Sequence, residues 1–199
     1  MSSKQQLVGN LKYGLTFVVS APAGTGKTTL VQMLSKEFDS IKMSVSSTTR
    51  PPRSYEIDGS HYHFLTESQF SEKVEHGDFL EHVSLFGYRY GTSYGHVEEL
   101  KKKGYHVVLV IDTQGAVQLM KKIKATFIFL MPPTTEELTR RLRDRGTEED
   151  VEIKTRLEWS EKEMEVAKLY DYLIVNDDLS IAYQVLRSIV IAEEHRIQK

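Results

Sequence analysis

Residues 21–28 have the types and spacing of a loop that binds a polyphosphate. Their sequence, Ala-Pro-Ala-Gly-Thr-Gly-Lys-Thr, fits the pattern G-x-x-x-x-G-K-[ST] with alanine in place of the first glycine. Gly24 and Gly26 allow the backbone to turn its amide groups inward. Lys27 can place a positive charge at the β- and γ-phosphates, and the Thr28 hydroxyl can ligate Mg²⁺. Alanine is the smallest replacement for glycine, so we expect the loop to tolerate it.

The segments on either side of this loop support the same interpretation. The apolar run 15–19 precedes it, and Leu30, Leu34 and Phe38 follow it at helical spacing. A helix that begins at the loop presents unpaired N–H groups and the positive end of its dipole to an anion. An ordinary strand-to-helix turn with glycines and a lysine is the alternative, and the flanking pattern favours the phosphate loop. The motif by itself indicates a nucleoside triphosphate, not a reaction.

Five short apolar runs are predicted to be buried strands. They are Leu15–Val19, Ile41–Val45, His106–Ile111, Thr126–Met131 and Tyr172–Val175. Two of them, 107–111 and 127–130, are continuously apolar, which is typical of parallel strands covered on both faces. Helical segments lie between most of the runs, so the fold class is α/β with a parallel, doubly wound sheet. The phosphate loop then lies at the carboxyl edge of that sheet.

Two segments do not fit a simple alternation of strands and helices. Residues 46–95 contain a Ser/Thr/Arg/Pro-rich stretch and a short helix with a capping box at 66–69 and a stop at Gly77, which predicts a small β-rich insert. Residues 134–156 follow Pro132-Pro133 and predict a helical hairpin. Its signals are a capping box at 134–137, a stop at Gly146 and an N-cap at Thr147. The last helix carries Ile181, Val185 and Ile189 in one stripe, which we expect to face the core.

Composition excludes several functional classes. The chain has 199 residues, with 40% hydrophobic and 27% charged residues, as in an ordinary globular protein. A net charge of −2 gives no global basic field for nucleic acid. No cysteine is present, so disulfides and thiolate metal sites are excluded. The N-terminal residues have no apolar signal core and no run is long enough to span a membrane, so we expect a cytoplasmic protein without a membrane partner.

A second motif lies between Thr48 and Phe64 and reads T-T-R-x-x-R-x-x-E-x-x-G-x-x-Y-x-F. This pattern resembles the signature of guanylate kinases. The resemblance extends to the runs at 79–81, 88–93, 111–115, 145–147 and 174–178, and so covers about residues 14–195.

The resemblance implies a P-loop three-layer fold with a five-stranded parallel core, an insert that binds the nucleoside monophosphate, and a helical lid. The implied boundaries are 14–45, 96–133 and 157–195 for the core, 46–95 for the GMP-binding insert, and 134–156 for the lid. The implied activity is transfer of the γ-phosphoryl group of ATP to GMP or dGMP in purine nucleotide metabolism, with Mg²⁺. A monomer and a homodimer are both compatible with the sequence.

The GMP site implied by the resemblance combines a phosphate clasp with a base reader. Arg50 and Arg53 would bind the phosphate through planar guanidinium groups. Glu81 would accept the N1–H and the 2-amino group of guanine, whereas adenine would leave this carboxylate underpaired. The full set is Ser46, Arg50, Arg53, Glu56, Tyr62, Glu81, Tyr90, Thr92 and Asp112. In it, the tyrosines would donate to the phosphate, and Ser46 and Thr92 would approach the other edge of the base.

The implied ATP and catalytic sites lie around the phosphate loop and the lid. The ATP-binding set is Ala21, Pro22, Ala23, Gly24, Thr25, Gly26, Lys27, Thr28, Thr29 and Asn176. The catalytic set is Lys27, Arg141, Arg145 and Arg156, whose charges would stabilise the phosphoryl group in transit. Thr28 and Asp112 would hold Mg²⁺. Many guanylate kinases have a second carboxylate two residues before Asp112, where this chain has Val110.

Other interpretations remain open from the sequence. A guanylate-kinase-like module that binds protein partners is the main alternative. The phosphate loops of such modules tend to have lost their functional residues, whereas this chain keeps Lys27 and Thr28. A P-loop kinase for another small acceptor is less favoured, because it would not need Glu81 with the arginine and tyrosine set. The lid arginines alternate with acidic residues and could form a solvated face. We expect Arg140 and Arg143 to lie on that surface.

Overall fold

The computed structural model describes residues 6–144 and 150–197, and for 150–154, 156 and 161 only the backbone. Its centre is a sheet of five parallel strands. In spatial order the strands are β2 (Ile41–Met43), β7 (His106–Ile111), β1 (Thr16–Ser20), β8 (Thr126–Met131) and β9 (Tyr172–Val175). The prediction of five parallel strands is confirmed, and β7, β8 and β9 have the predicted bounds.

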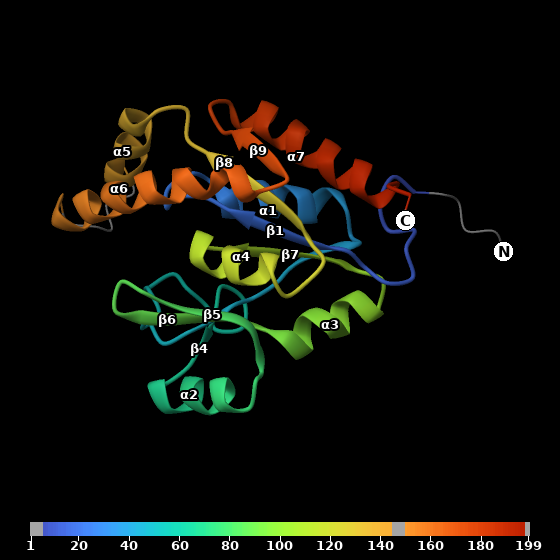
Figure 1. Cartoon of the computed structure of the whole chain (residues 1–199), viewed down its shortest axis with the longest axis horizontal. Coiled ribbons are helices and arrows are strands. Elements are labelled where there is room, and N and C mark those ends of the chain that lie inside the picture. Colours follow the sequence, from blue (N-terminus) through green and yellow to red (C-terminus); the bar gives the residue numbers. More distant parts are fainter. Residues whose placement is uncertain (1–5, 145–149, 198–199) are drawn as a thin grey trace.

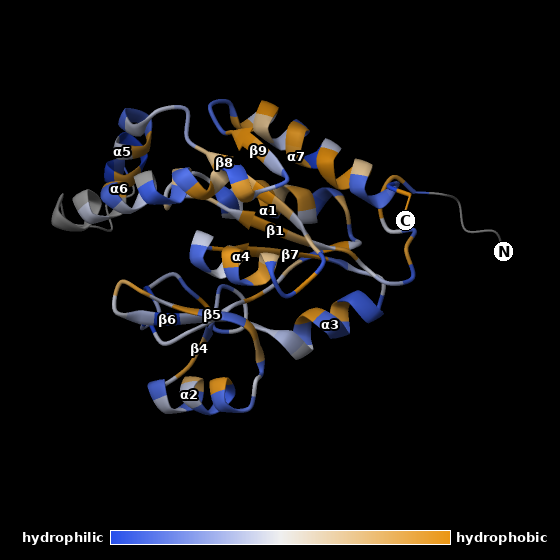
Figure 2. Cartoon of the chain, viewed as in Figure 1, coloured by the Kyte–Doolittle hydropathy of each residue, from blue (hydrophilic) through white to orange (hydrophobic). Residues whose placement is uncertain are grey.

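Helices cover both faces of this sheet (Figure 1). They are α1 (Lys27–Glu37) and α7 (Leu179–Glu194) on one face, and α3 (Tyr94–Lys102) and α4 (Thr113–Met120) on the other. In β1, Phe17 and Val19 pack toward α1 and α7, and Val18 packs toward α3 and α4. Side chains on both faces are therefore buried, which explains the continuously apolar strands (Figure 2).

A second sheet lies within the predicted insert. Its spatial order is β4 (His63–Phe64), β3 (Ser47–Thr48), β6 (Tyr88–Ser93) and β5 (Phe79–Leu85). Helix α2 (Glu67–Glu75) packs on it, with the Phe70 ring stacked 4.7 Å from that of Phe79. The capping box predicted at Thr66 and Gln69 is present. The boundaries of the three units remain predictions.

The predicted lid, 134–156, falls in a pair of helices, α5 (Thr135–Asp144) and α6 (Asp150–Glu165), the second of which runs past the predicted boundary and is followed by the short helix η1 (Val166–Leu169). Leu138 and Leu142 of α5 are buried against Ala23 of the phosphate loop and Leu157 of α6. The helical hairpin thus rests on the phosphate loop through apolar contacts. The predicted stop at Gly146 and N-cap at Thr147 lie outside the described residues.

The prediction for the last helix is wrong in its choice of face. Ile181 and Val185 are 63% and 41% exposed, and only Ile189 of the predicted stripe is buried. The core face is instead formed by Ala182, Tyr183, Leu186, Ile189 and Val190. Apolar residues occur on more than one side of α7, so helical spacing alone fits two stripes. None of the described helices is long and apolar enough to cross a membrane.

Candidate active site

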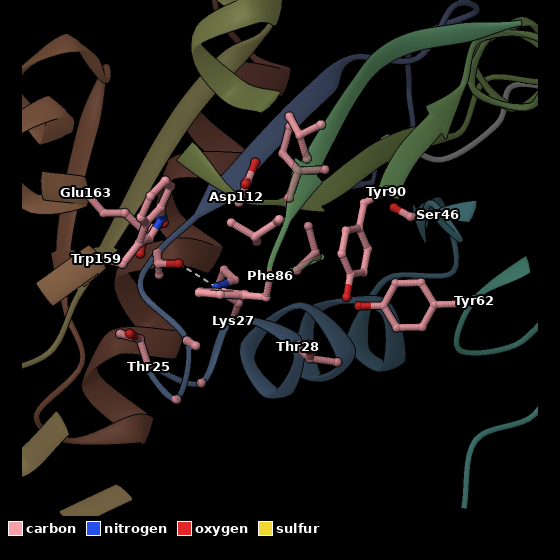
Figure 3. Close-up of a pocket in the computed structure, with 18 of the residues that line it drawn as sticks. Thr25, Lys27, Thr28, Ser46, Tyr62, Phe86, Tyr90, Asp112, Trp159 and Glu163 are labelled. Atoms are coloured by element: carbon pink, nitrogen blue, oxygen red, sulfur yellow. Dashed lines mark hydrogen bonds between the residues drawn. The ribbon is translucent and has the colours of Figure 1, made fainter. Parts of the chain in front are cut away.

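The phosphate loop has the geometry that its glycines predict. Gly24 and Gly26 have φ angles of 85° and 92°, and α1 begins immediately afterwards at Lys27. Lys27 Nζ donates to the Ala21 carbonyl at 2.6 Å, a bond drawn in Figure 3. Among the described residues, Phe86 alone has positive φ without being glycine. The first motif position therefore has an ordinary backbone, which is why alanine fits there.

One cavity of about 480 Å³ brings together most of the predicted site residues. Its lining includes Ala21, Ala23, Gly24, Thr25, Gly26, Lys27, Thr28, Thr29, Ser46, Arg50, Arg53, Tyr62, Glu81, Tyr90, Asp112 and Arg141. Four predicted residues, Pro22, Glu56, Thr92 and Asn176, support that lining from behind. Arg145 lies outside the described residues, and only the backbone of Arg156 is described, within α6.

Glu56 organises the arginine clasp. Its carboxylate accepts two bonds from Arg50 Nη2, at 2.8 and 2.9 Å, and one from the backbone N–H of Arg53 at 2.7 Å. The Arg50 guanidinium also lies over the Tyr62 ring, 5.5 Å from its centroid. The hydroxyls of Tyr62 and Tyr90 point toward each other in the cavity (Figure 3). This corner offers fixed donors and positive charge, which suits a phosphate dianion.

Glu81 is a buried carboxylate at the inner wall of the cavity. It is 3% exposed, and its Oε1 accepts a bond from the Thr92 hydroxyl at 2.6 Å. Burial raises the pKa of Glu81 to about 7, with a smaller contribution from the nearby Asp112 carboxylate. Thr92 thus fixes the orientation of Glu81, and the carboxylate is the group able to accept paired donors from a ligand.

Gly115 of α4 gives the Glu81 carboxylate the space it occupies. A Cβ at this position would lie 2.6 Å from Glu81 Oε2. The resemblance implies that Glu81 reads guanine, and on that expectation Gly115→Ala should raise KM for GMP about tenfold, because the added methyl group displaces the carboxylate. Alanine favours the helix by roughly 0.5–1 kcal/mol, so α4 itself should persist. Steady-state kinetics with varied GMP measure the effect.

Gly95→Ala is the matched control, because a Cβ added at Gly95 in α3 would meet no neighbouring atom of the described residues within 4 Å. It should retain the KM of the unmodified protein. An unchanged KM in Gly115→Ala would contradict the placement of Glu81 at the ligand.

Asp112 lies at the end of β7 and caps α4. Its Oδ1 accepts the Gly115 N–H at 2.8 Å, whereas its buried Oδ2 has no hydrogen-bond partner within the described part of the chain. Burial raises the pKa of Asp112, and Lys27 opposes that rise. An unsatisfied carboxylate oxygen in the same cavity as the Thr28 hydroxyl fits a hard cation such as Mg²⁺.

The lid contacts the phosphate loop through a polar relay as well as apolar packing. Arg141 lines the cavity; its Nε donates to Glu137 at 2.7 Å and its Nη1 to the Asn176 carbonyl at 3.0 Å. The Asn176 amide in turn donates to the Thr25 carbonyl at 2.7 Å. Asn176 therefore braces the loop, and its predicted contact with adenine stays a prediction. Arg140 and Arg143 are exposed, as expected.

Seven residues of the lining lie outside the predicted site sets: Val83, Leu85, Phe86, Val110, Ile111, Trp159 and Glu163. Phe86, at the tip of the β5–β6 hairpin, meets Trp159 of α6 with ring centroids 6.2 Å apart. Glu163 lies one turn further along α6 and is 6% exposed (Figure 3). Trp159 and Glu163 are four residues apart, so they lie on the same face of a helix, and this spacing was the available signal for their shared position. The neighbouring residues of α6 are mostly charged and obscure it.

Comparisons with known proteins agree with this geometry. A family model described as guanylate kinase matches residues 13–193. The guanylate kinase of Protochlamydia amoebophila is 55% identical over 97% of this chain and 98% of its own length. That of Chlamydia muridarum is 51% identical over 91% and 89%. The crystal structure of guanylate kinase from Anaplasma phagocytophilum aligns with a TM-score of 0.76 at 33% identity, covering 92% of this chain and 88% of that one.

Proposed function

The chain belongs to the guanylate kinase family and is an ATP:GMP phosphotransferase, and we propose that its cavity binds the two nucleotides at opposite ends. The phosphate loop receives the ATP tail, with the inward amides and Lys27 against the β- and γ-phosphates. The clasp of Arg50, Arg53, Tyr62 and Tyr90 receives the GMP phosphate. The observation that carries this assignment is that both anion sites line one cavity.

Glu81 selects the base in this proposal. Guanine presents two adjacent donors, N1–H and the 2-amino group, and a carboxylate accepts both. Adenine presents an acceptor at N1 and no 2-amino group, so Glu81 would stay buried and underpaired. GMP and dGMP share this base and should both be accepted.

Positioning and charge stabilisation carry the reaction. Lys27 and the lid arginine Arg141 neutralise charge on the transferred phosphoryl group, and the closed lid keeps water away from it. Thr28 and Asp112 would hold Mg²⁺, which supplies further neutralisation of the phosphate oxygens when it is bound. Arg145 and Arg156 stay in the catalytic set as predictions from the family motif.

The interaction-module alternative has no support in these observations. Lys27 and Thr28 are present as the first two residues of α1, and the curated relatives carry the name of the enzyme.

A panel of acceptors tests the proposal. With ATP and Mg²⁺, GMP and dGMP should release ADP at high rates, and AMP, CMP and UMP at rates lower by about 10² or more. A coupled assay of ADP release across these monophosphates measures the rates. Comparable kcat/KM for AMP and GMP would remove Glu81 as the base reader.

A further inference from the structure

Glu163 is a buried carboxylate at the active site that the mechanism above does not use. It projects from α6 into the cavity that also contains Thr28 and Asp112. Its Oε1 accepts a bond from the Thr113 hydroxyl at 3.1 Å, and Thr113 directly follows Asp112. Helix α6 is therefore fastened to the first residue of α4 through an acidic side chain.

The charges around Glu163 favour a cation. Burial raises the pKa of Glu163 to about 7; the Lys27 ammonium opposes that rise, and the Asp112 carboxylate adds to it. Two buried carboxylates thus face one lysine, and Asp112 Oδ2 lacks a hydrogen-bond partner in the described chain. Ionising both carboxylates in one cavity is costly unless a further positive charge joins them.

The segment at the end of strand β7 supplies only one carboxylate, that of Asp112, to the proposed Mg²⁺ site. Val110, two residues before Asp112, also lines the cavity but carries no charge. Mg²⁺ in phosphate-transferring sites keeps several waters and takes one or two carboxylates together with substrate phosphates. A second acidic group from another element can therefore complete this site by binding those waters.

On this basis, we propose that Glu163 is a positioning residue that supplies the second carboxylate of the Mg²⁺ site, by accepting hydrogen bonds from the water shell of the ion. This inference rests on the function proposed above. Leu157, on the same helix as Glu163, packs against Leu138 and Leu142 of α5, so a movement of this helix pair would carry the Glu163 carboxylate with it. Glu163 would thereby link lid position to metal binding.

The test measures how Mg²⁺ changes ATP affinity in the absence of acceptor, so that no turnover occurs. Trp159 is the single tryptophan and lies one turn before Glu163 at the cavity, so its fluorescence reports binding. In Glu163→Gln, the Mg²⁺ concentration that produces half of the change in ATP affinity should rise about tenfold or more. ATP affinity in EDTA should stay unchanged or improve, because a negative charge is removed.

Three variants separate this role from simple fastening of the helix. Glu165→Gln removes an exposed charge from the same helix and should match the unmodified protein. Glu163→Asp keeps the charge and should restore part of the Mg²⁺ response. Thr113→Val removes the anchor and should shift the response in the same direction, and it decides the question if Glu163→Gln does not fold.

A lowered melting temperature in Glu163→Gln with an unchanged Mg²⁺ response would overturn the inference. Glu163 would then have only a structural role. The function proposed above fails separately, since it requires the unmodified protein to turn over GMP in the coupled assay.

Discussion

Replacing Lys27 by alanine is expected to lower kcat at least about a hundredfold to a thousandfold while the fold persists. Lys27 is the first residue of α1, and its Nζ is held over the phosphate loop by the Ala21 carbonyl at 2.6 Å and the Pro22 carbonyl at 3.3 Å. Its charge is therefore placed before ATP arrives. Without it, the developing charge on the transferred group loses a preorganised cation.

Folding should not depend on this side chain, because the hydrophobic core beneath α1 is formed by Leu30, Val31 and Leu34. Thermal unfolding and steady-state kinetics on the same preparation separate the two effects. Lys36→Ala, on the exposed side of the same helix, should retain full activity. If a folded Lys27→Ala variant turned over GMP at near the original rate, Lys27 would have no part in the mechanism.

The features that the sequence predicted correctly are those written in local patterns. A buried parallel strand must be apolar on both faces, so β7 and β8 appeared as continuous runs with the observed bounds. Gly24 and Gly26 of the phosphate loop have positive φ angles, which residues with a Cβ rarely adopt. Glycine is therefore needed at these two positions, which is why the loop could be recognised in the sequence. Arg50, Arg53 and Tyr62 were grouped correctly at one cavity because they lie within one short segment, and their binding of a phosphate stays a prediction.

The features it missed depend on how distant segments pack. Glu163 belongs to a helix whose other residues are mostly charged, and its burial follows only from the docking of α6 over Thr113. Glu56 and Thr92 hold Arg50 and Glu81 through hydrogen bonds, a role that needs three-dimensional contacts to be seen, and their predicted contacts with the ligand stay predictions. In α7, two apolar stripes competed, and packing on α1 selected the one containing Leu186.

Glu81→Gln is expected to lower kcat/KM for GMP by about 10²–10³ and to reduce the preference for GMP over AMP. The amide offers one acceptor where the carboxylate offers two, and its NH₂ group faces a donor of guanine. A lost charged hydrogen bond and an unpaired buried donor together cost about 3–5 kcal/mol. The packing against Thr92 should survive, because Gln Oε1 can still accept its hydroxyl. Glu72→Gln, exposed on α2, is the matched control.

The pH dependence of GMP binding provides an independent signature of the same carboxylate. Burial raises the pKa of Glu81 to about 7, so the neutral form dominates below that pH in the free enzyme. Since guanine binding requires the ionised form, KM for GMP should rise as pH falls below 7, by about tenfold per unit at the lower end. Glutamine does not titrate, so Glu81→Gln should lose this dependence and keep a high, flat KM. A pH profile of KM that is the same in both proteins would show that another group controls guanine binding.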